Sequence, residues 1–196
     1  MFEDFEQYIK QYVPALTHEE LALIRSVSVV RNVRRRHRFV QEGEICRHKL
    51  FVIRGLVRTY AVAEDGGEYV MRFTAEHGWT TDPESYINQT PSKYTIEALE
   101  PTAVVLWSYD DFERLRAAIP AVNAFSESAL AQNLSETQKR VLMNISATAE
   151  QKYRYFQTTF PDIARRVPLH MIASYLGVSR ETLTRIRQGL AVAAKG

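Results

Sequence analysis

Cysteine is nearly absent from this chain: Cys46 is the only one in 196 residues. One cysteine cannot form a disulfide within the chain, and a single chain cannot build a four-cysteine zinc or iron–sulfur site from it. Histidine is also scarce, and His37, His48 and His77 lack the close spacing that metal or haem ligation needs. We therefore expect no metal ion and no other cofactor.

Long apolar runs are missing as well. No stretch of about 20 apolar residues occurs, so the sequence predicts no membrane-spanning helix and no membrane partner. The chain begins Met-Phe-Glu-Asp-Phe, which is acidic and lacks the basic region and apolar core of a signal peptide. We expect a cytoplasmic protein.

Acidic residues are few in the last quarter of the chain. From Gln151 to Gly196 there are eight Lys or Arg and two Asp or Glu, a net charge of +6. The total is only +2, which leaves −4 for the first 150 residues. This asymmetry predicts that the C-terminal part binds a polyanion.

Residues 169–188, within this basic part, have the pattern of two short helices joined by a tight turn. Pro168 suits the first position of the first helix, where its missing N–H costs nothing. Gly177 can adopt the left-handed backbone that ends a helix in a corner, and Ser179 can cap the next helix. The apolar positions that would hold the two helices together are Ile172, Ala173, Leu176, Leu183 and Ile186. The pattern predicts a helix-turn-helix.

The polar residues of the second predicted helix suit contact with DNA. They are Arg180, Glu181, Thr184, Arg185 and Arg187. Arginine can pair with N7 and O6 of guanine, glutamate can accept from N4 of cytosine, and hydroxyl groups can bind phosphates. The alternative is an ordinary helical hairpin with a solvated charged face. The glycine, cap and apolar positions together favour the DNA-binding motif.

Ahead of this motif, short runs rich in β-branched and aromatic residues alternate with turns. The predicted strands cover residues 27–33, 37–40, 50–53, 56–62, 68–73, 94–98 and 103–108. Glycines recur every eleven or twelve residues from Gly43 to Gly78, which is typical of a β-barrel or jelly roll. Asp65-Gly66 predicts a two-residue hairpin turn because both residues tolerate positive φ.

Helices are predicted on both sides of the strands. Residues 2–13 have apolar side chains at helical spacing, and the sequence from Thr17 to Glu20 fits a capping box that starts a second helix. Ser108 can cap a short helix that ends near Arg116. Later helices are expected over residues 149–160 and, as a short turn, 162–167, and residues 191–196 are expected to fray.

The longest predicted helix runs from Pro120 to about Ser146. Along it a stripe at helical spacing contains Leu130, Leu134, Thr137, Val141 and Ile145. Such a stripe either packs against the helix's own domain or forms a coiled-coil seam. A long helix between two compact parts has few neighbours, so we expect a seam and a homodimer.

The order of these parts resembles that of the CRP/FNR superfamily of bacterial transcription regulators. The resemblance is sharpest at residues 173–187, with GVSRET at 177–182, and FVIRGLVR at 51–58 is similar to the family's first roll hairpins. It implies an α+β fold in three parts. These are a β-roll sensor domain of the double-stranded β-helix or jelly-roll type (1–118), a long dimerisation helix (119–146) and a helix-turn-helix domain (147–196).

The resemblance also implies how DNA would be bound. The recognition helices of a dimer would read a near-palindromic operator in double-stranded DNA. The positions that match base-reading residues are Arg180, Glu181 and Arg185. Ser179 and Thr182 match positions that touch the DNA backbone, and Thr184 and Arg187 are expected to join them.

The sensor part departs from the pattern of relatives that bind cyclic nucleotides. Those relatives bind the phosphate with an arginine, but no arginine occurs here between Arg72 and Arg114. Lys93 offers a point charge instead of a bidentate fork, and Pro83, not glycine, precedes Glu84, the candidate ribose contact. We expect that cyclic AMP does not bind and that the site takes another ligand or none. The expected lining of an effector pocket is Trp79, Glu84, Tyr86, Ser92, Lys93 and Tyr94.

Residues 31–38, RNVRRRHR, form a basic run in the strand region. We expect a solvated strand there. Alternatively, these basic residues stabilise a carboxylate on a neighbouring hairpin or contact RNA polymerase.

Two other functions are open. One is a cupin-like metal-binding enzyme with a helical appendage, but the chain lacks a His-x-His pair, a phosphate loop and an HExxH motif, so we expect no enzyme. The other is a protein-interaction module that has lost DNA binding, against which the positive C-terminal part argues.

Overall fold

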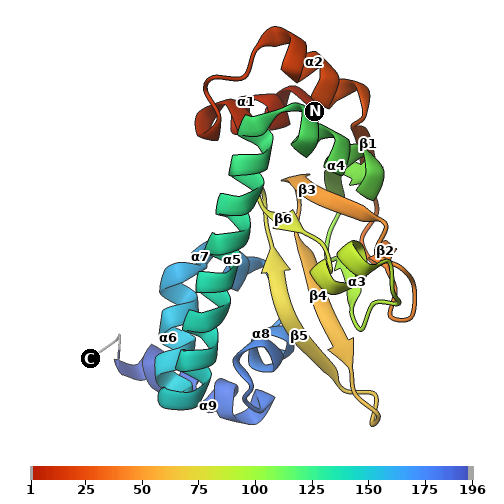
Figure 1. Cartoon of the computed structure of the whole chain (residues 1–196). Helices are drawn as coiled ribbons and strands as arrows, with labels where there is room; N and C mark the ends of the chain where they lie inside the picture. The colour runs from red at the N-terminus through yellow and green to blue at the C-terminus, as the bar shows by residue number, and fades with distance from the viewer. Residues whose placement is uncertain (1, 194–196) are drawn as a thin grey trace.

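The computed structural model describes residues 2–193. Met1 of the predicted first domain and residues 194–196 of the predicted last domain lie outside the described residues. The fold is the predicted α+β arrangement (Figure 1). The long helix α5 (Pro120–Ser146) runs along one side of the molecule, from the N-terminal helices to the C-terminal helices. The predicted domain boundaries fall at the two ends of this helix.

Within the described residues, the β-roll consists of two four-stranded antiparallel sheets. The first has the order β1 (Val29–Val33), β8 (Thr102–Ser108), β3 (His48–Arg54) and β6 (Trp79–Thr80). The second has the order β2 (Arg38–Val40), β7 (Thr95–Ala98), β4 (Val57–Val62) and β5 (Glu68–Thr74). Because β5 is an edge strand, the backbone groups on its outer side need another partner.

Alternation along β3 and β8 divides the core into two layers, because successive side chains of a strand point to opposite faces. The residues that face the second sheet are Leu50, Val52, Val104 and Leu106. Those on the opposite face are Phe51, Ile53, Val105 and Trp107. The second group is covered by α1 (Phe2–Tyr12), α2 (His18–Ser26) and α4 (Tyr109–Ala118).

The predicted strands are all present, with ends shifted by at most two residues. Val27, for example, is the C-cap of α2 rather than the start of a strand. Two short elements were not predicted, β6 and α3 (Pro83–Asn88). A local signal for α3 exists, because Asp82 caps it by accepting from the N–H of Glu84 (3.2 Å) and proline follows at its first position.

The predicted two-residue turn at Asp65-Gly66 is wrong. The loop between β4 and β5 spans residues 63–67, and the N–H of Gly66 donates to the carbonyl of Ala63 (2.9 Å). In this loop only Gly66 has a positive φ, of 82°, and the Asp65 carboxylate accepts from the N–H of Gly67 (2.9 Å). A longer loop with a single left-handed glycine therefore joins the strands.

The predicted caps of α2 and α4 are confirmed. The Thr17 hydroxyl accepts from the N–H of Glu20 (3.2 Å), and the Glu20 carboxylate accepts from the N–H of Thr17 (2.8 Å), which completes the capping box of α2. The Ser108 hydroxyl accepts from the N–H of Asp111 (3.1 Å) and starts α4.

Four helices follow α5: α6 (Ala149–Thr159), α7 (Pro161–Arg166), α8 (Leu169–Leu176) and α9 (Arg180–Ala193). Residues 191–196 were expected to fray. Of these, residues 191–193 belong to α9, and residues 194–196 lie outside the described residues. The C-terminal helices share a core that includes Phe156 and Leu183, and Leu56 and Phe73 of the roll belong to the same core. The helix-turn-helix part is therefore docked against the roll.

Candidate nucleic-acid interface

The predicted helix-turn-helix is formed by α8 and α9. Gly177 lies in the left-handed region with a φ of 65°, and α8 ends there. The N–H of Val178 donates to the carbonyl of Ala173 (3.0 Å) and that of Gly177 to the carbonyl of Ser174 (3.2 Å), so the last carbonyls of α8 have partners. Pro168 is the N-cap of α8 and not its first residue, which corrects the prediction by one position.

Hydroxyl groups organise the start of α9. The Ser179 hydroxyl accepts from the N–H of Thr182 (3.1 Å) and donates to Oγ1 of Thr182 (3.0 Å), so it caps the helix as predicted. The Thr184 hydroxyl donates to the carbonyl of Arg180 (2.8 Å). Ser179 and Thr184 are two of the residues predicted to contact the DNA backbone. Their hydroxyl protons therefore form hydrogen bonds within the helix.

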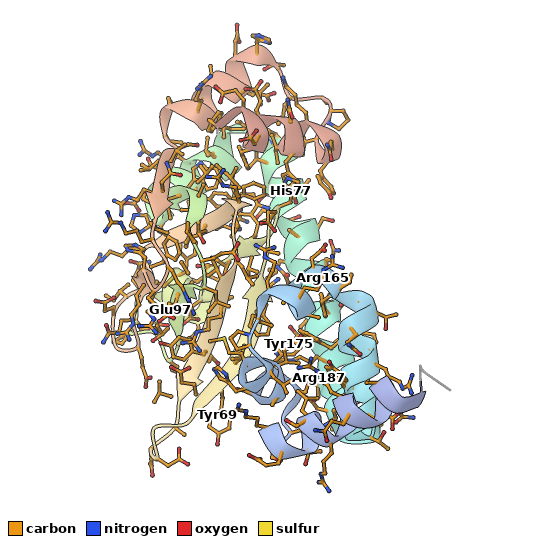
Figure 2. The ribbon with its side chains drawn as sticks, turned by 180° about the vertical axis from the view of Figure 1, so that it is seen from behind. Tyr69, His77, Glu97, Arg165, Tyr175 and Arg187 are labelled. Atoms are coloured by element: carbon orange, nitrogen blue, oxygen red, sulfur yellow. The ribbon has the colours of Figure 1, made fainter. Side chains whose placement is uncertain are left out.

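Burial separates the faces of α9. Leu183 is fully buried and Ile186 is half-buried in the core that the C-terminal helices share, whereas Arg180, Glu181 and Arg185 are exposed. Among the described residues, these three side chains have no hydrogen-bond or ion-pair partner. The helix lies at the outer end of the molecule, away from the N-terminal helices (Figure 2). The three candidate base-reading side chains are thus together and accessible.

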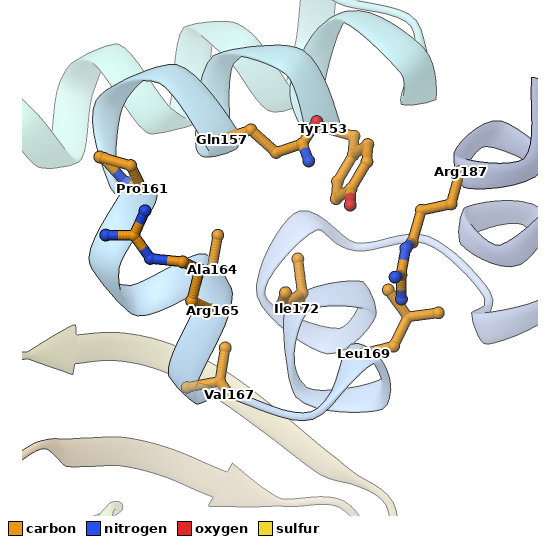
Figure 3. Close-up of a pocket in the computed structure, with 9 residues that line it drawn as sticks. All are labelled: Tyr153, Gln157, Pro161, Ala164, Arg165, Val167, Leu169, Ile172 and Arg187. Atoms are coloured by element: carbon orange, nitrogen blue, oxygen red, sulfur yellow. The ribbon is translucent and has the colours of Figure 1, made fainter. Parts of the chain in front are cut away.

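Arg187 lies on α9 nearer to the buried face than Glu181 and Arg185 do. Its side chain lines a pocket with Tyr153 and Leu169 (Figure 3). This position flanks the buried face, because Arg187 follows Leu183 by four residues. Its contact with the DNA backbone stays a prediction.

Tyr175 connects the helix-turn-helix to three other elements. Its ring lies between Phe73 of β5 and Phe156 of α6, with centroid distances of 5.5 and 5.4 Å. The Arg140 guanidinium of α5 lies 5.0 Å from the centroid of the same ring. This aromatic contact sets the position of α8 beside β5 (Figures 1 and 2).

Arg166 of α7 makes a second connection to the roll. Its guanidinium donates to Glu76 (2.8 and 2.9 Å) and to Glu100 (2.6 and 3.3 Å). Burial opposes ionisation of Glu76, but the hydrogen bonds from Arg166 and from backbone N–H groups outweigh it and lower the pKa of the carboxyl to about 2. Neither Arg166 nor its partners were singled out from the sequence, because the residues are 66 and 90 positions apart.

The predicted stripe on α5 is exposed. Leu130, Leu134, Val141 and Ile145 are 62%, 59%, 50% and 79% exposed, and Thr137 is exposed between them. These side chains are therefore not buried against the chain's own roll. An apolar stripe in water is the pattern expected of a helix that meets a second copy.

The six residues of the predicted effector pocket are not gathered in one place. Trp79 belongs to the core under α1 and stacks on Trp107 (centroids 5.3 Å apart). Tyr86 belongs to the core between the sheets. Glu84 and Lys93 form an exposed ion pair (3.0 Å). An effector site built from all six stays a prediction.

Ser92 and the half-buried Tyr94 complete that set. The Ser92 hydroxyl donates to Asp82 (2.7 Å) and to the carbonyl of Tyr94 (2.9 Å), and Ser92 and Asp82 are both buried. At this position, where the resemblance leads us to expect a phosphate-binding group, the chain therefore has a buried carboxylate. A carboxylate repels a phosphate.

A buried charge network lies in the second sheet and was not predicted from the sequence. Arg58 lies opposite Glu97 in the register of β4 and β7 and is 3.2 Å from it. Glu68 is its second carboxylate partner, and Tyr60 packs on the guanidinium, which is 3.9 Å from the ring centroid. The run FVIRGLVR could have revealed it, because a charge within a buried strand needs a partner.

The basic run at residues 31–38 covers β1 and the loop to β2, where Arg34, Arg35 and Arg36 are exposed.

Among the residues that the structure describes, no three His, Cys, Asp or Glu side chains gather where a metal ion could be held. None of the described helices has the length and apolar composition of a membrane span.

The β-roll, the long helix and the helix-turn-helix form an architecture that can be compared with those of known proteins. The family model of the cyclic nucleotide-binding domain matches residues 30–118, which cover most of the roll. FixK2 from Bradyrhizobium japonicum is 19% identical to the chain, with a TM-score of 0.72 over 86% of each chain. No curated protein matches the chain in sequence.

Two further structures give the same result. A protein described as a transcriptional regulator of the CRP/FNR family, from Eubacterium rectale, is 18% identical (TM-score 0.71; 92% of this chain and 86% of that one). The c-di-GMP responsive global regulator CLP from Xanthomonas campestris is 16% identical (TM-score 0.69; 91% and 93%). The chain therefore has the fold of the CRP/FNR superfamily, as the sequence resemblance predicts. Both neighbours are described as regulators.

Proposed function

We propose that the protein is a sequence-specific transcription regulator that binds double-stranded DNA as a dimer. One observation carries the proposal: α9 buries Leu183 and leaves Arg180, Glu181 and Arg185 exposed and without partners. Two arginines in this state can pair with guanine edges at no cost in broken ion pairs. Each well-formed bidentate contact contributes about 1–3 kcal/mol of discrimination between bases.

The exposed residues divide into two roles. Arg180 and Arg185 read guanine, and Glu181 accepts from cytosine or orients one of these arginines, since an acidic side chain near phosphates is otherwise unfavourable. Contacts to the DNA backbone come from Ser179, Thr182, Thr184 and Arg187. These contacts set the register of the helix and supply much of the affinity.

The dimer forms through α5. Pairing two copies of α5 would bury Leu130, Leu134, Val141 and Ile145, whose exposure in the single chain supports the proposal. A two-fold axis along this seam would present two copies of α9 to successive major grooves. The half-sites would be about 10 base pairs apart and form a near-palindrome.

The effector of this regulator is not cyclic AMP. A phosphate near Ser92 would meet the buried Asp82 carboxylate instead of an arginine fork. The roll senses another ligand or none. The protein would act in the cytoplasm, and the contact of residues 31–38 with RNA polymerase stays a prediction.

Selection from a random DNA library with the purified protein tests the proposal. We expect enrichment of one near-palindromic sequence, and loss of that enrichment in a triple variant with Arg180→Ala, Glu181→Ala and Arg185→Ala. All three positions are exposed, so circular dichroism should show an unchanged fold. If the wild-type protein enriches no sequence, the chain is an interaction module and not a regulator of this kind.

A further inference from the structure

A pocket lies inside the helix-turn-helix domain, between α6, α7, α8 and α9 (Figure 3). Its volume is about 560 Å³, within the range of about 300–1,000 Å³ that small-molecule sites occupy. It is separate from the roll, where the predicted effector residues lie. Of the residues proposed above to contact DNA, Arg187 alone lines this pocket.

The inner wall of the pocket is apolar. Val167 and Ile172 are 7% and 3% exposed, and Leu169 is half-buried beside them. These side chains already pack in the core of the domain. Of these three side chains, Leu169 keeps the exposed apolar surface on which the apolar part of a ligand could lie without disturbing the core.

Three polar side chains line the pocket without a hydrogen-bond or ion-pair partner among the described residues: Tyr153, Gln157 and Arg187. Tyr153 is 5% exposed, and its hydroxyl points toward the space between Ile172 and Arg187 (Figure 3). Among the described residues neither this hydroxyl nor the Arg187 guanidinium has a hydrogen-bond or ion-pair partner. The Tyr153 hydroxyl and the exposed Arg187 guanidinium are therefore free to bind a ligand.

The chemistry of these two groups defines the ligand. Burial raises the pKa of Tyr153, an effect that the nearby Arg187 only partly offsets, so the hydroxyl remains a donor at neutral pH. Arg187 is a donor with a positive charge. The other arginine of the pocket, Arg165, is already paired with Asp162. One free cation and one free hydroxyl beside an apolar wall fit a single carboxylate attached to an apolar group.

We propose that this pocket binds a small organic carboxylate with an apolar body. Its carboxylate accepts from the Tyr153 hydroxyl and from Arg187, and its apolar part lies on Val167, Leu169 and Ile172. If α9 is the recognition helix, as proposed above, the ligand also withdraws Arg187 from the DNA backbone. Ligand and DNA would then weaken each other's binding by the same factor.

Calorimetric titration of the full chain without DNA tests the site. The probes are 2-naphthoate, 3-phenylpropionate and decanoate, with 2-naphthamide as the uncharged analogue of the first. We expect at least one carboxylate to bind with a Kd below about 1 mM and the amide to bind at least about tenfold more weakly. Tyr153→Phe should weaken the carboxylate about 3- to 10-fold and Arg187→Gln about tenfold.

Arg185→Gln is the matched control, because Arg185 is an equally exposed arginine of the same helix that does not line the pocket. It should leave carboxylate binding unchanged. The proposal is overturned if none of the three carboxylates binds, or if Tyr153→Phe and Arg187→Gln bind as the wild type does. Because no DNA is present, this result is independent of whether the protein proves to be a DNA-binding regulator.

Discussion

The hydroxyl of Ser174 on α8 accepts a hydrogen bond from the backbone N–H of Val70 on β5, at 2.8 Å. It also donates to the carbonyl of Glu68 at 2.7 Å. One side chain therefore satisfies two backbone groups of an edge strand that would otherwise need a further strand. A movement of the helix-turn-helix away from the roll that carries α8 with it must break both bonds.

Replacing Ser174 with alanine should loosen this junction without unfolding the roll. The lost hydrogen bonds contribute about 1 kcal/mol, so the amide of Val70 should exchange with solvent about fivefold faster. Hydrogen exchange measured by NMR checks this, with the amide of Tyr60 on the neighbouring strand as the internal control. Equal acceleration at Val70 and Tyr60 would instead mean that the whole sheet is destabilised.

The ion pairs of Arg166 should make stability depend on acid pH. The pKa of Glu76 in the fold is about 2, below its ordinary value of 4.5. Its contribution is therefore fully present above pH 4.5 and is lost as the pH falls from 4.5 to 2. After allowance for solvent screening of a carboxylate that is 35% exposed, we expect a loss of about 1–2 kcal/mol.

Chemical denaturation between pH 2 and 6 measures this loss. In Arg166→Gln the slope between pH 4.5 and 2 should be reduced, because Glu76 no longer has its partner. Arg165→Gln is the matched control, since the exposed pair of Arg165 with Asp162 should contribute little. Identical pH profiles for the Arg166 variant and the wild type would refute the assignment.

The seam predicts a specific effect on assembly. Leu134→Glu places a charge in the middle of the exposed stripe and should convert dimers to monomers in light scattering. Gln132→Glu, on the opposite side of α5 and also exposed, should leave the dimer intact. A Leu134→Glu protein that retains the dimer mass would exclude this interface.

The recognition helix predicts a specific effect on sequence choice. Arg185→Ala should weaken binding to the selected operator by about 1–3 kcal/mol and relax the preference at one base pair of each half-site. Fluorescence anisotropy with the operator and its single-base variants measures both quantities. Equal loss on the operator and on random DNA would assign Arg185 to the phosphate backbone.

Local patterns in the sequence were sufficient for most of the elements. The strands follow from β-branched and aromatic runs, and the turn between α8 and α9 follows from Gly177 and Ser179, whose roles depend on neighbours within five residues. The turn at Asp65-Gly66 failed because several loop lengths suit that pair, and α3 is too short to show a helical period. At both places the local residue preferences are compatible with several structures and do not select one of them.

The arrangement of parts could not be predicted in the same way. Ser174 bonds a strand 104 residues earlier, and the Arg166 partners are 90 and 66 residues away, so no periodicity reveals either contact. The same limit applies to Trp79 and Tyr86, which were grouped by sequence proximity. They lie in different cores because the sheet separates them.

The central claim is that two copies of α9 read two half-sites on one face of the double helix. The most direct test is the affinity of the wild-type protein for its selected operator before and after five base pairs are inserted between the half-sites. Half a helical turn moves the second half-site to the opposite face, so we predict that affinity falls to the level of a single half-site. Unchanged affinity would contradict the account.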